Sequence, residues 1–180
     1  MKKRYVKKNL MLIAAIVLLV IIAQPKLWLI IAGGIIILAG ELIRVWATGH
    51  LRRNQEVTTS GPYAYLRDPL YLGRLFLLIG FCVMATGYGL FLFLPVALCV
   101  FAYSYMPRKY KKEMARLEKR FGEEYRQYAS YCGSLIPRLK PYARSDNRKW
   151  RVSLFWHENR EQYFILIVVL IAVAIIFRLR

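Results

Sequence analysis

The stretch that decides how this chain is organised runs from Ser60 to Gly73 and reads SGPYAYLRDPLYLG. It is polar, aromatic and rich in turns, and it lies between uncharged hydrophobic runs. Gly61-Pro62 and Asp68-Pro69 are turn signals, because proline fixes its own φ and moves the preceding residue out of helical geometry. Its other distinctive side chains are three tyrosines and two opposite charges: Tyr63, Tyr65, Tyr71, Arg67 and Asp68. A plain connector between two helices needs neither rings nor an ion pair, so we interpret this segment as a binding loop.

The composition is typical of an integral membrane protein. Of the 180 residues, 58% are hydrophobic, yet the formal net charge is +18. A soluble domain rarely combines these two properties, whereas a membrane protein with basic cytosolic faces does so naturally. Five apolar runs predict membrane helices, and they cover residues 10–23, 27–40, 75–85, 88–105 and 163–177. We therefore expect a single-domain, all-α integral membrane protein, with about five membrane helices arranged as hairpins and a binding loop over residues 59–74.

Features within and beside these runs refine the prediction. Most of the runs are shorter than the roughly 20 residues that cross a bilayer, so Trp28 and Trp46 are expected to act as interfacial anchors. The pair Gly33-Gly34 inside the second run predicts close packing against another helix. The three cysteines show no CxxC spacing and neither histidine has a second ligand nearby, so no metal is expected.

The distribution of basic residues predicts the orientation. Five Lys or Arg lie in residues 1–9, five in 44–74 and fifteen in 107–160, whereas the Gln24–Lys26 turn holds one and the Thr86–Gly87 turn none. By the positive-inside rule, the N-terminus, the binding loop and the long basic segment are cytoplasmic. Because these residues adjoin apolar runs and form no nucleic-acid-binding motif, we expect membrane lipids rather than nucleic acid as their partner.

The same orientation sends Arg178 and Arg180, at the end of the last run, to the outer side. This leaves open a tilted or re-entrant course for that run. The sequence says nothing about the oligomeric state.

An amphipathic helix is predicted over residues 108–131 on the cytosolic side. Apolar and aromatic side chains recur there every three or four residues, at Tyr110, Met114, Leu117, Phe121, Tyr125 and Tyr128. A helix lying on the membrane surface explains this stripe. Glu113 and Glu124 are three turns apart, so a straight helix places them on one face, roughly 16 Å from each other. They are expected either to hold opposite ends of an elongated ligand or to pair with neighbouring Lys and Arg.

A further group of polar residues lies at the end of the second run. Glu41 and Arg44 are spaced to pair on one helix face, and an ionisable residue at that depth also marks a candidate site. His50 is either a proton acceptor near neutral pH or a structural residue. The triplet Asn159–Glu161 either faces the same cavity or caps the last helix.

Two segments together resemble a known enzyme group. Residues 44–73 read RVWATGHLRRNQEVTTSGPYAYLRDPLYLG, and residues 113–128, beyond an apolar hairpin, read EMARLEKRFGEEYRQY. They resemble the isoprenylcysteine carboxyl methyltransferase and phospholipid methyltransferase superfamily, and especially its short bacterial members. Those proteins show a GPY-x-x-x-R-[HN]-P-x-Y-x-G loop and a later E-E-x-x-L-x-x-x-F-G-x-E-Y-x-x-Y helix. The resemblance implies a methyltransferase that binds S-adenosylmethionine between its membrane helices and its cytosolic C-terminal region.

The resemblance also implies roles for individual residues. The cofactor contacts it implies are Gly61, Pro62, Tyr63, Arg67, Asp68, Pro69, Tyr71, Gly73, Glu113 and Tyr125. The catalytic or substrate-side residues are expected to be Arg44, His50 and Glu124. Two positions depart from the family pattern, since Asp68 stands where His or Asn is usual and Met114 replaces the second glutamate. An ionised Asp68 accepts but does not donate hydrogen bonds, so it would attract the cofactor's amino group or its sulfonium.

The methyl acceptor is expected to be lipophilic. Arg44, Arg52 and Arg53 are available to bind an anionic group, which favours a carboxylate or phosphate-bearing lipid. Prenylated cysteine, phosphatidylethanolamine, a quinone-type isoprenoid and another small hydrophobic acid all stay open. Two alternative functions are an NADPH-dependent membrane reductase of the sterol-reductase type, which has a similar R-H-P-x-Y loop, and a non-catalytic lipid-binding membrane protein. Binding of S-adenosylmethionine, of NADPH or of neither separates the three.

Overall fold

This computed structural model describes residues 2–85 and 90–179, and within these ranges the chain forms helices and no strand. The all-α prediction is therefore confirmed for the described residues. In chain order the elements are α1 (Lys2–Ile22), α2 (Leu27–Thr48), η1 (Gly61–Ala64), α3 (Pro69–Ala85), α4 (Leu90–Cys99), η2 (Val100–Tyr105), α5 (Met106–Tyr131), η3 (Leu154–Glu158) and α6 (Glu161–Ile176). The predicted Thr86–Gly87 turn and the start of the run 88–105 lie outside the described residues.

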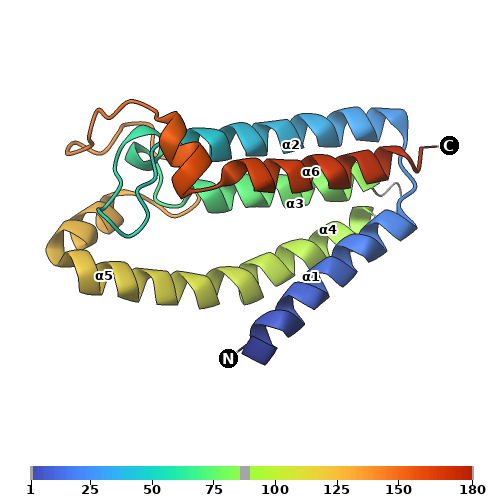
Figure 1. The fold of residues 1–180 in the computed structure, drawn as a ribbon, viewed down its shortest axis with the longest axis horizontal. Helices are drawn as coiled ribbons and strands as arrows, with labels where there is room; N and C mark the ends of the chain where they lie inside the picture. The colour runs from blue at the N-terminus through green and yellow to red at the C-terminus, as the bar shows by residue number, and fades with distance from the viewer. Residues whose placement is uncertain (1, 86–89, 180) are drawn as a thin grey trace.

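Three of the helices form a bundle, and α1, α4, η2 and α5 lie to one side of it. Figure 1 shows α2, α3 and α6 side by side, while α4, η2 and α5 continue into one another as a long curved rod. The non-helical segments between α2 and α3 and between α5 and η3 gather at one end of the bundle. This end is the part of the molecule that carries the binding loop predicted above.

The first half of the predicted loop contains only the short 3-10 helix η1, and its second half belongs to α3. The loop was predicted to run to residue 74, but α3 begins at Pro69. Proline is well suited to the first position of a helix, because the N–H that it lacks has no partner there. The carbonyl of Asp68 accepts hydrogen bonds from the N–H groups of Tyr71 and Leu72, at 3.0 and 3.2 Å. The turn signal at Asp68-Pro69 is thus the start of a helix, and it orients Tyr71 on the first turn.

The predicted amphipathic helix is present in α5 but is broken at Gly122. This glycine has φ 54° and ψ −125°, which lies outside helical geometry and is readily adopted only by glycine. The prediction that Glu113 and Glu124 share one face is therefore wrong, because helical periodicity does not carry across the break. Further back in the rod, α4 contains Pro95, and η2 is a π-helical segment.

Paired glycines bring α2 and α3 into backbone contact. A Cβ atom added to Gly33 would lie 2.6 Å from the carbonyl oxygen of Gly80, and one added to Gly80 would lie 2.9 Å from that of Gly33. Gly40 and Gly73 form a second reciprocal pair, with distances of 2.9 and 2.8 Å. Small residues at such contacts let two helix backbones approach closely. The predicted close packing is confirmed for Gly33, whereas Gly34 faces open space.

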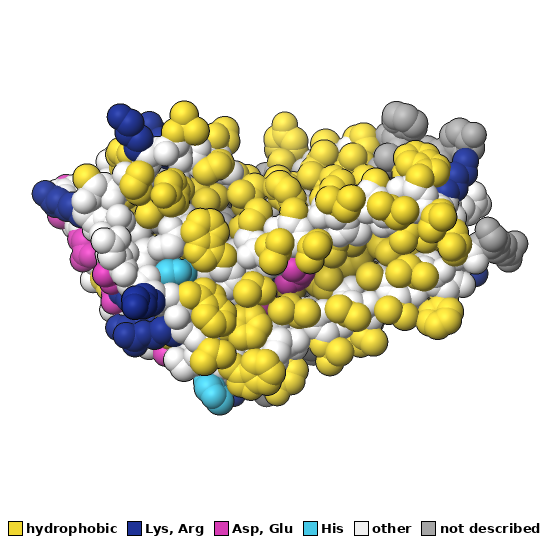
Figure 2. Space-filling model, turned by 90° about the horizontal axis from the view of Figure 1, so that it is seen from above, with side chains coloured by type: hydrophobic (Ala, Val, Ile, Leu, Met, Phe, Trp, Pro, Cys, Tyr) yellow, Lys and Arg dark blue, Asp and Glu magenta, His cyan; other side chains and the backbone are white. Residues whose placement is uncertain are grey.

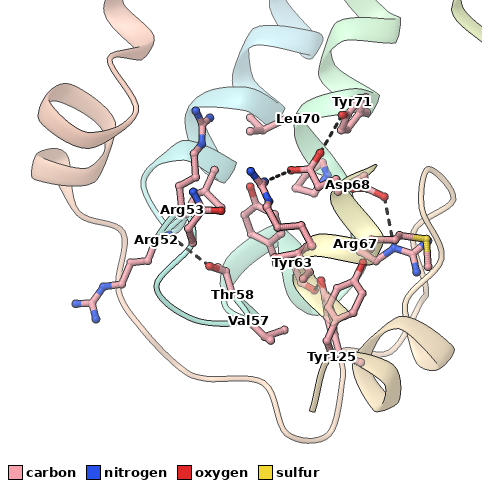
Figure 3. Close-up of a pocket in the computed structure, with 18 of the residues that line it drawn as sticks. Arg52, Arg53, Val57, Thr58, Tyr63, Arg67, Asp68, Leu70, Tyr71 and Tyr125 are labelled. Atoms are coloured by element: carbon pink, nitrogen blue, oxygen red, sulfur yellow. Dashed lines mark hydrogen bonds and ion pairs between the residues drawn. The ribbon is translucent and has the colours of Figure 1, made fainter. Parts of the chain in front are cut away.

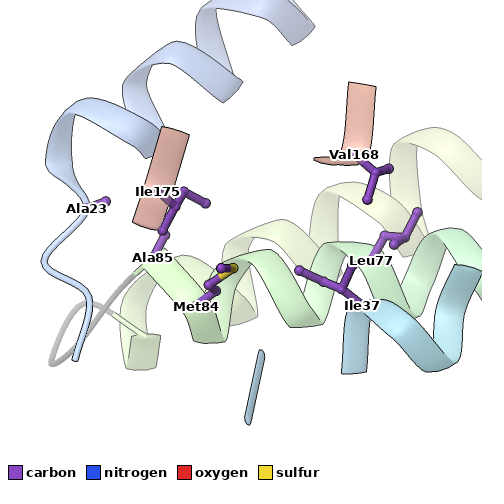
Figure 4. Close-up of a cluster of buried hydrophobic side chains, with 7 residues drawn as sticks. All are labelled: Ala23, Ile37, Leu77, Met84, Ala85, Val168 and Ile175. Atoms are coloured by element: carbon purple, nitrogen blue, oxygen red, sulfur yellow. The ribbon is translucent and has the colours of Figure 1, made fainter. Parts of the chain in front are cut away.

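The hydrophobic core lies between the three bundle helices and the end of α1. Figure 4 shows the seven buried side chains that form it: Ala23, Ile37, Leu77, Met84, Ala85, Val168 and Ile175. Many other apolar side chains point outward instead. Figure 2 shows them covering most of one face, with most charged groups toward its ends and one acidic side chain near its middle. On α2 alone, Ile35, Leu38 and Leu42 are each at least 60% exposed. An exposed apolar surface of this extent is unusual for a soluble monomer.

One described helix, α2, is long and apolar enough to cross a membrane, and it lies near the N-terminus. Four shorter apolar helical stretches accompany it: Ile13–Ile22, Pro69–Ala85, Phe93–Tyr103 and Glu161–Ile176. α6 runs along the bundle from the loop end to the opposite end, where Arg178 donates a hydrogen bond to the carbonyl of Ile21 at 2.9 Å (Figure 1). The last run is thus a helix that passes along the bundle rather than one that turns back.

Candidate functional site

A cavity of about 600 Å³ lies at the loop end of the molecule. Its walls come from the segment after α2, the start of α3 and both halves of α5 (Figure 3). Seven of the residues predicted to contact a cofactor line it: Tyr63, Arg67, Asp68, Pro69, Tyr71, Glu113 and Tyr125. This volume falls in the range of small-molecule sites. The two sequence motifs therefore meet at one cavity.

A hydrogen bond across the cavity joins these two motifs. The phenol of Tyr71, on the first turn of α3, donates to Oε2 of Glu113 on α5 at 3.1 Å. The other carboxylate oxygen of Glu113 lies 3.7 Å from a guanidinium nitrogen of Arg116, one turn further along α5. Glu113 is thus held from both sides and presents a fixed negative charge to the cavity.

Asp68 is held in the cavity wall by a residue that sequence reasoning missed. The hydroxyl of Ser134 donates to Oδ2 of Asp68 at 2.7 Å, and Nε of Arg67 lies 3.5 Å from the same oxygen. Burial raises the pKa of Asp68, while the hydrogen bond from Ser134 and the charge of Arg67 oppose that shift. Arg67 also donates to the carbonyl of Ala129 at 3.3 Å. The pair at positions 67 and 68 is therefore anchored to the last turns of α5 and to the chain that follows it.

The aromatic side of the cavity is built from neutral phenols. Tyr128 donates a hydrogen bond to the carbonyl of Tyr63 at 2.8 Å. Burial strongly raises the pKa of both tyrosines, so both rings stay protonated at neutral pH. Tyr128 also packs edge-on against Tyr142, with ring centroids 5.6 Å apart.

The apolar stripe of α5 faces the protein. Tyr125 and Tyr128 are buried with Cys132, and Met114, Leu117 and Phe121 pack against this cluster. The side chain of Tyr110 lies outside what the structure describes. Val57 and Tyr142 also pack against this cluster, so its buried tyrosines are covered by the protein itself. The location of this helix on a membrane surface stays a prediction.

A segment that we name the strap, residues 133–151, supports the loop from outside. Its backbone exchanges hydrogen bonds with the loop in antiparallel order. The N–H of Arg67 donates to Gly133, those of Arg138 and Tyr142 to Tyr65 and Ala64, and that of Arg151 to Gly49, all at 2.8–3.0 Å. No sequence signal indicates this pairing, because the strap is basic, contains two prolines and lacks strand periodicity. Backbone pairing of this kind depends on register and barely on side-chain type.

Three of the predicted cofactor residues shape the cavity without lining it. Gly61 has a positive φ of 59°, and the ring of His50 occupies the space where a side chain would stand. Pro62 is fully buried in η1. Gly73 packs against Gly40 and against the stem of Arg44.

None of the three predicted catalytic residues lines the cavity. Arg44 is 2% exposed and forms an ion pair with Glu161 of α6, while Phe164 lies beneath its guanidinium with the ring centroid at 3.6 Å. Glu41 lies at the limit of an ion pair with Arg44, at 4.0 Å. Glu124 lines a smaller hollow of about 300 Å³, next to Gln127, on the far side of the break at Gly122.

His50 is buried under the loop. Its Nδ1 lies 3.2 Å from the hydroxyl of Ser60. Burial, followed by the positive charge of Arg148, lowers the pKa of His50, so the ring is neutral at physiological pH. The amide of Asn159 donates to the carbonyls of Thr48 and Leu51, at 2.9 and 3.0 Å. The triplet Asn159–Glu161 thus ties the start of α6 to the end of α2 and lies away from the cavity.

The fold and the site together define a class: an all-helical protein with a loop-capped, tyrosine- and arginine-rich cavity beside an exposed apolar face. Comparisons with protein-family models, with curated proteins and with solved structures find no match to this chain. The likeness to the methyltransferase superfamily therefore stays a hypothesis that rests on the two motifs.

Proposed function

We propose that this protein is an integral membrane methyltransferase that uses S-adenosylmethionine to methylate a lipophilic acceptor. The observation that carries the proposal is the hydrogen bond between Tyr71 and Glu113. It joins two side chains that are 42 residues apart in the sequence, one from each motif, at one cavity. Both motifs were assigned to one cofactor site from the resemblance alone, and their meeting supports that assignment.

The side chains in the cavity suit this cofactor. Asp68 and Glu113 offer carboxylates to an amino group, and both are held by neighbours that keep them oriented. The rings of Tyr63, Tyr71 and Tyr125 line the same space and suit a sulfonium through cation–π attraction. The two departures from the family pattern, Asp68 and Met114, both face this cavity.

The location of the protein in a membrane is part of the proposal. The exposed apolar face and the spanning length of α2 support it. Trp28 and Trp46, near the two ends of α2, are 64% and 46% exposed, as interfacial anchors would be. The excess of Lys and Arg in the loop and the strap favours a cytoplasmic cavity, in a bacterial inner membrane.

The cavity walls explain how methyl transfer would be assisted. When bound, the cofactor supplies an electrophilic methyl group. Tyr71 and Arg116 hold Glu113, and Ser134 holds Asp68, so these charges need no reorganisation during reaction. The apolar side chains of Leu70 and Leu117 help to keep water out. Because His50 and Glu124 lie outside the cavity, the acceptor that fits best is one that needs no base, such as an ionised carboxylate.

An NADPH-dependent reductase is the second candidate function, and the excess of positive charge in the cavity favours it. Six basic side chains line it against three carboxylates. A phosphate-rich dinucleotide such as NADPH suits such an excess of positive charge better than S-adenosylmethionine alone does.

Calorimetric titration of the detergent-purified protein with S-adenosylmethionine and with NADPH tests the proposal. We expect binding of S-adenosylmethionine, weakened roughly tenfold or more in Tyr71→Phe and Glu113→Gln. The matched control is Glu123→Gln on the same helix, since Glu123 is exposed and pairs only loosely with Arg126, at 3.6 Å. Preference for NADPH would favour the reductase, and binding of neither would favour a non-catalytic lipid-binding protein.

A further inference from the structure

The carboxylates that line the cavity are already engaged by neighbouring groups. Glu56 pairs with Arg148 of the strap and lies 3.8 Å from Arg52. Asp68 accepts the hydrogen bond from Ser134, and Glu113 accepts that from Tyr71. The three carboxylates do not balance the six basic side chains of the lining, so the cavity keeps an excess of positive charge.

Two of the six basic side chains in the lining, those of Arg53 and Lys112, have no ion-pair or hydrogen-bond partner among the described residues. Arg53 comes from the segment after α2, where Figure 3 shows it among the lining side chains, and Lys112 comes from α5. Charges of one sign on two walls of a half-enclosed space raise the local concentration of oppositely charged ligands.

The cavity also has an apolar component. Leu51, Leu70 and Val57 line it from the loop side, and Met114 and Leu117 line it from α5. A ligand that fills this space is thus expected to be an amphiphile, with an anionic head and an apolar body. S-adenosylmethionine carries a net positive charge, so it does not supply the missing negative charge.

We infer that the second ligand of this cavity, and hence the methyl acceptor, is an anionic amphiphile whose phosphate or carboxylate head is bound by Arg53 and Lys112. The inference rests on the proposed methyltransferase function. The sequence analysis named Arg44 among the residues available to bind an anionic group. Because Arg44 forms a buried ion pair with Glu161, we assign this contact to Lys112 instead. A zwitterionic or neutral acceptor does not satisfy the charge of the cavity.

The test is calorimetric titration of the full chain in a neutral maltoside detergent with three probes of equal chain length: decyl phosphate, decanoate and decanol. We expect one or both anions to bind roughly tenfold or more tightly than decanol. The comparison of decyl phosphate with decanoate then distinguishes a phosphate head from a carboxylate head. Equal binding of all three probes would overturn the inference.

The variant Arg53→Gln/Lys112→Gln removes the two proposed contacts. Its matched control is Lys140→Gln/Lys149→Gln, which removes the same total charge at exposed positions of the strap outside the cavity lining. We expect the first variant to lose the preference for anions and to keep its affinity for S-adenosylmethionine, and the control to keep both. An equal loss in both variants would mean that net charge alone attracts the probes, which contradicts the inference.

Failure of the inference is distinct from failure of the proposed function. If wild-type protein does not bind S-adenosylmethionine, the methyltransferase proposal fails whatever the probes do. If NADPH binds and displaces decyl phosphate, the positive charge serves the dinucleotide, and the assignment of an anionic acceptor is overturned.

Discussion

Different interactions stabilise two regions of the molecule. One is the bundle of α2, α3 and α6, and the other is the cap at its end, formed by residues 49–68 and the strap. In the bundle, reciprocal glycine contacts, apolar packing and one buried ion pair between Arg44 and Glu161 join the helices. In the cap, backbone hydrogen bonds between the loop and the strap carry the architecture. Side-chain shape thus determines the bundle, whereas backbone register determines the cap and with it the cavity.

The largest effect is expected from breaking the ion pair of the bundle. Arg44→Ala leaves Glu161 buried without its partner, at 5% exposure, beside Glu41. We expect a loss of about 3–5 kcal/mol of unfolding free energy, because an uncompensated charge stays in a low-dielectric interior. Denaturant titration of the detergent-solubilised protein measures this loss.

The control for this variant is Arg126→Ala, which removes an exposed pair with Glu118. We expect no measurable change there, since solvent screens the pair. A similarly small change in Arg44→Ala would show that water reaches the buried pair, and it would remove the contrast between bundle and cap.

A smaller effect is expected at the glycine contact between α2 and α3. Gly33→Ala forces a methyl group against the carbonyl of Gly80, and we expect it to cost about 1–3 kcal/mol. Gly34→Ala, one residue along the same helix, meets nothing within 4 Å and should gain up to about 1 kcal/mol from helix propensity. Thermal unfolding of both variants measures the difference, and equal behaviour would contradict close backbone contact.

The smallest effect is expected in the cap and depends on pH. Burial lowers the pKa of His50, so the folded protein favours the neutral ring. The resulting stabilisation is fully present above the pKa of an unfolded histidine, about 6.5. It is lost as the pH falls from there through the lower pKa of the folded state. We therefore expect His50→Asn to flatten the fall in stability over that window.

The matched control for this variant is His157→Asn, which changes the exposed histidine of η3. Unfolding free energies between pH 7.5 and 5 are measured for wild type and both variants. The same slope in His50→Asn as in wild type would show that another group accounts for the acid sensitivity of the cap.

The helices and the two motifs could be predicted because their signals are local. Apolar runs predicted the helical class, although several helices are longer than the runs. For example, α3 begins at Pro69, whereas the apolar run begins at residue 75. The roles of Tyr71 and Glu113 as neighbours followed only from the family resemblance. Periodicity failed at Glu124, because one glycine with positive φ ended the register that the pattern assumed.

What the sequence by itself determined is an all-helical chain with an amphipathic, aromatic stripe and a turn-rich loop. These features depend on the order of neighbouring side chains, which a sequence states directly. Only the tertiary structure decided that Ser134 holds Asp68, that Arg44 pairs with Glu161 and that the strap supports the loop. The two side-chain contacts join residues that are 66 and 117 positions apart, so no local pattern indicates them. The pairing of the strap with the loop uses backbone hydrogen bonds, in which any residue except proline can donate, so it leaves little trace in the side-chain sequence.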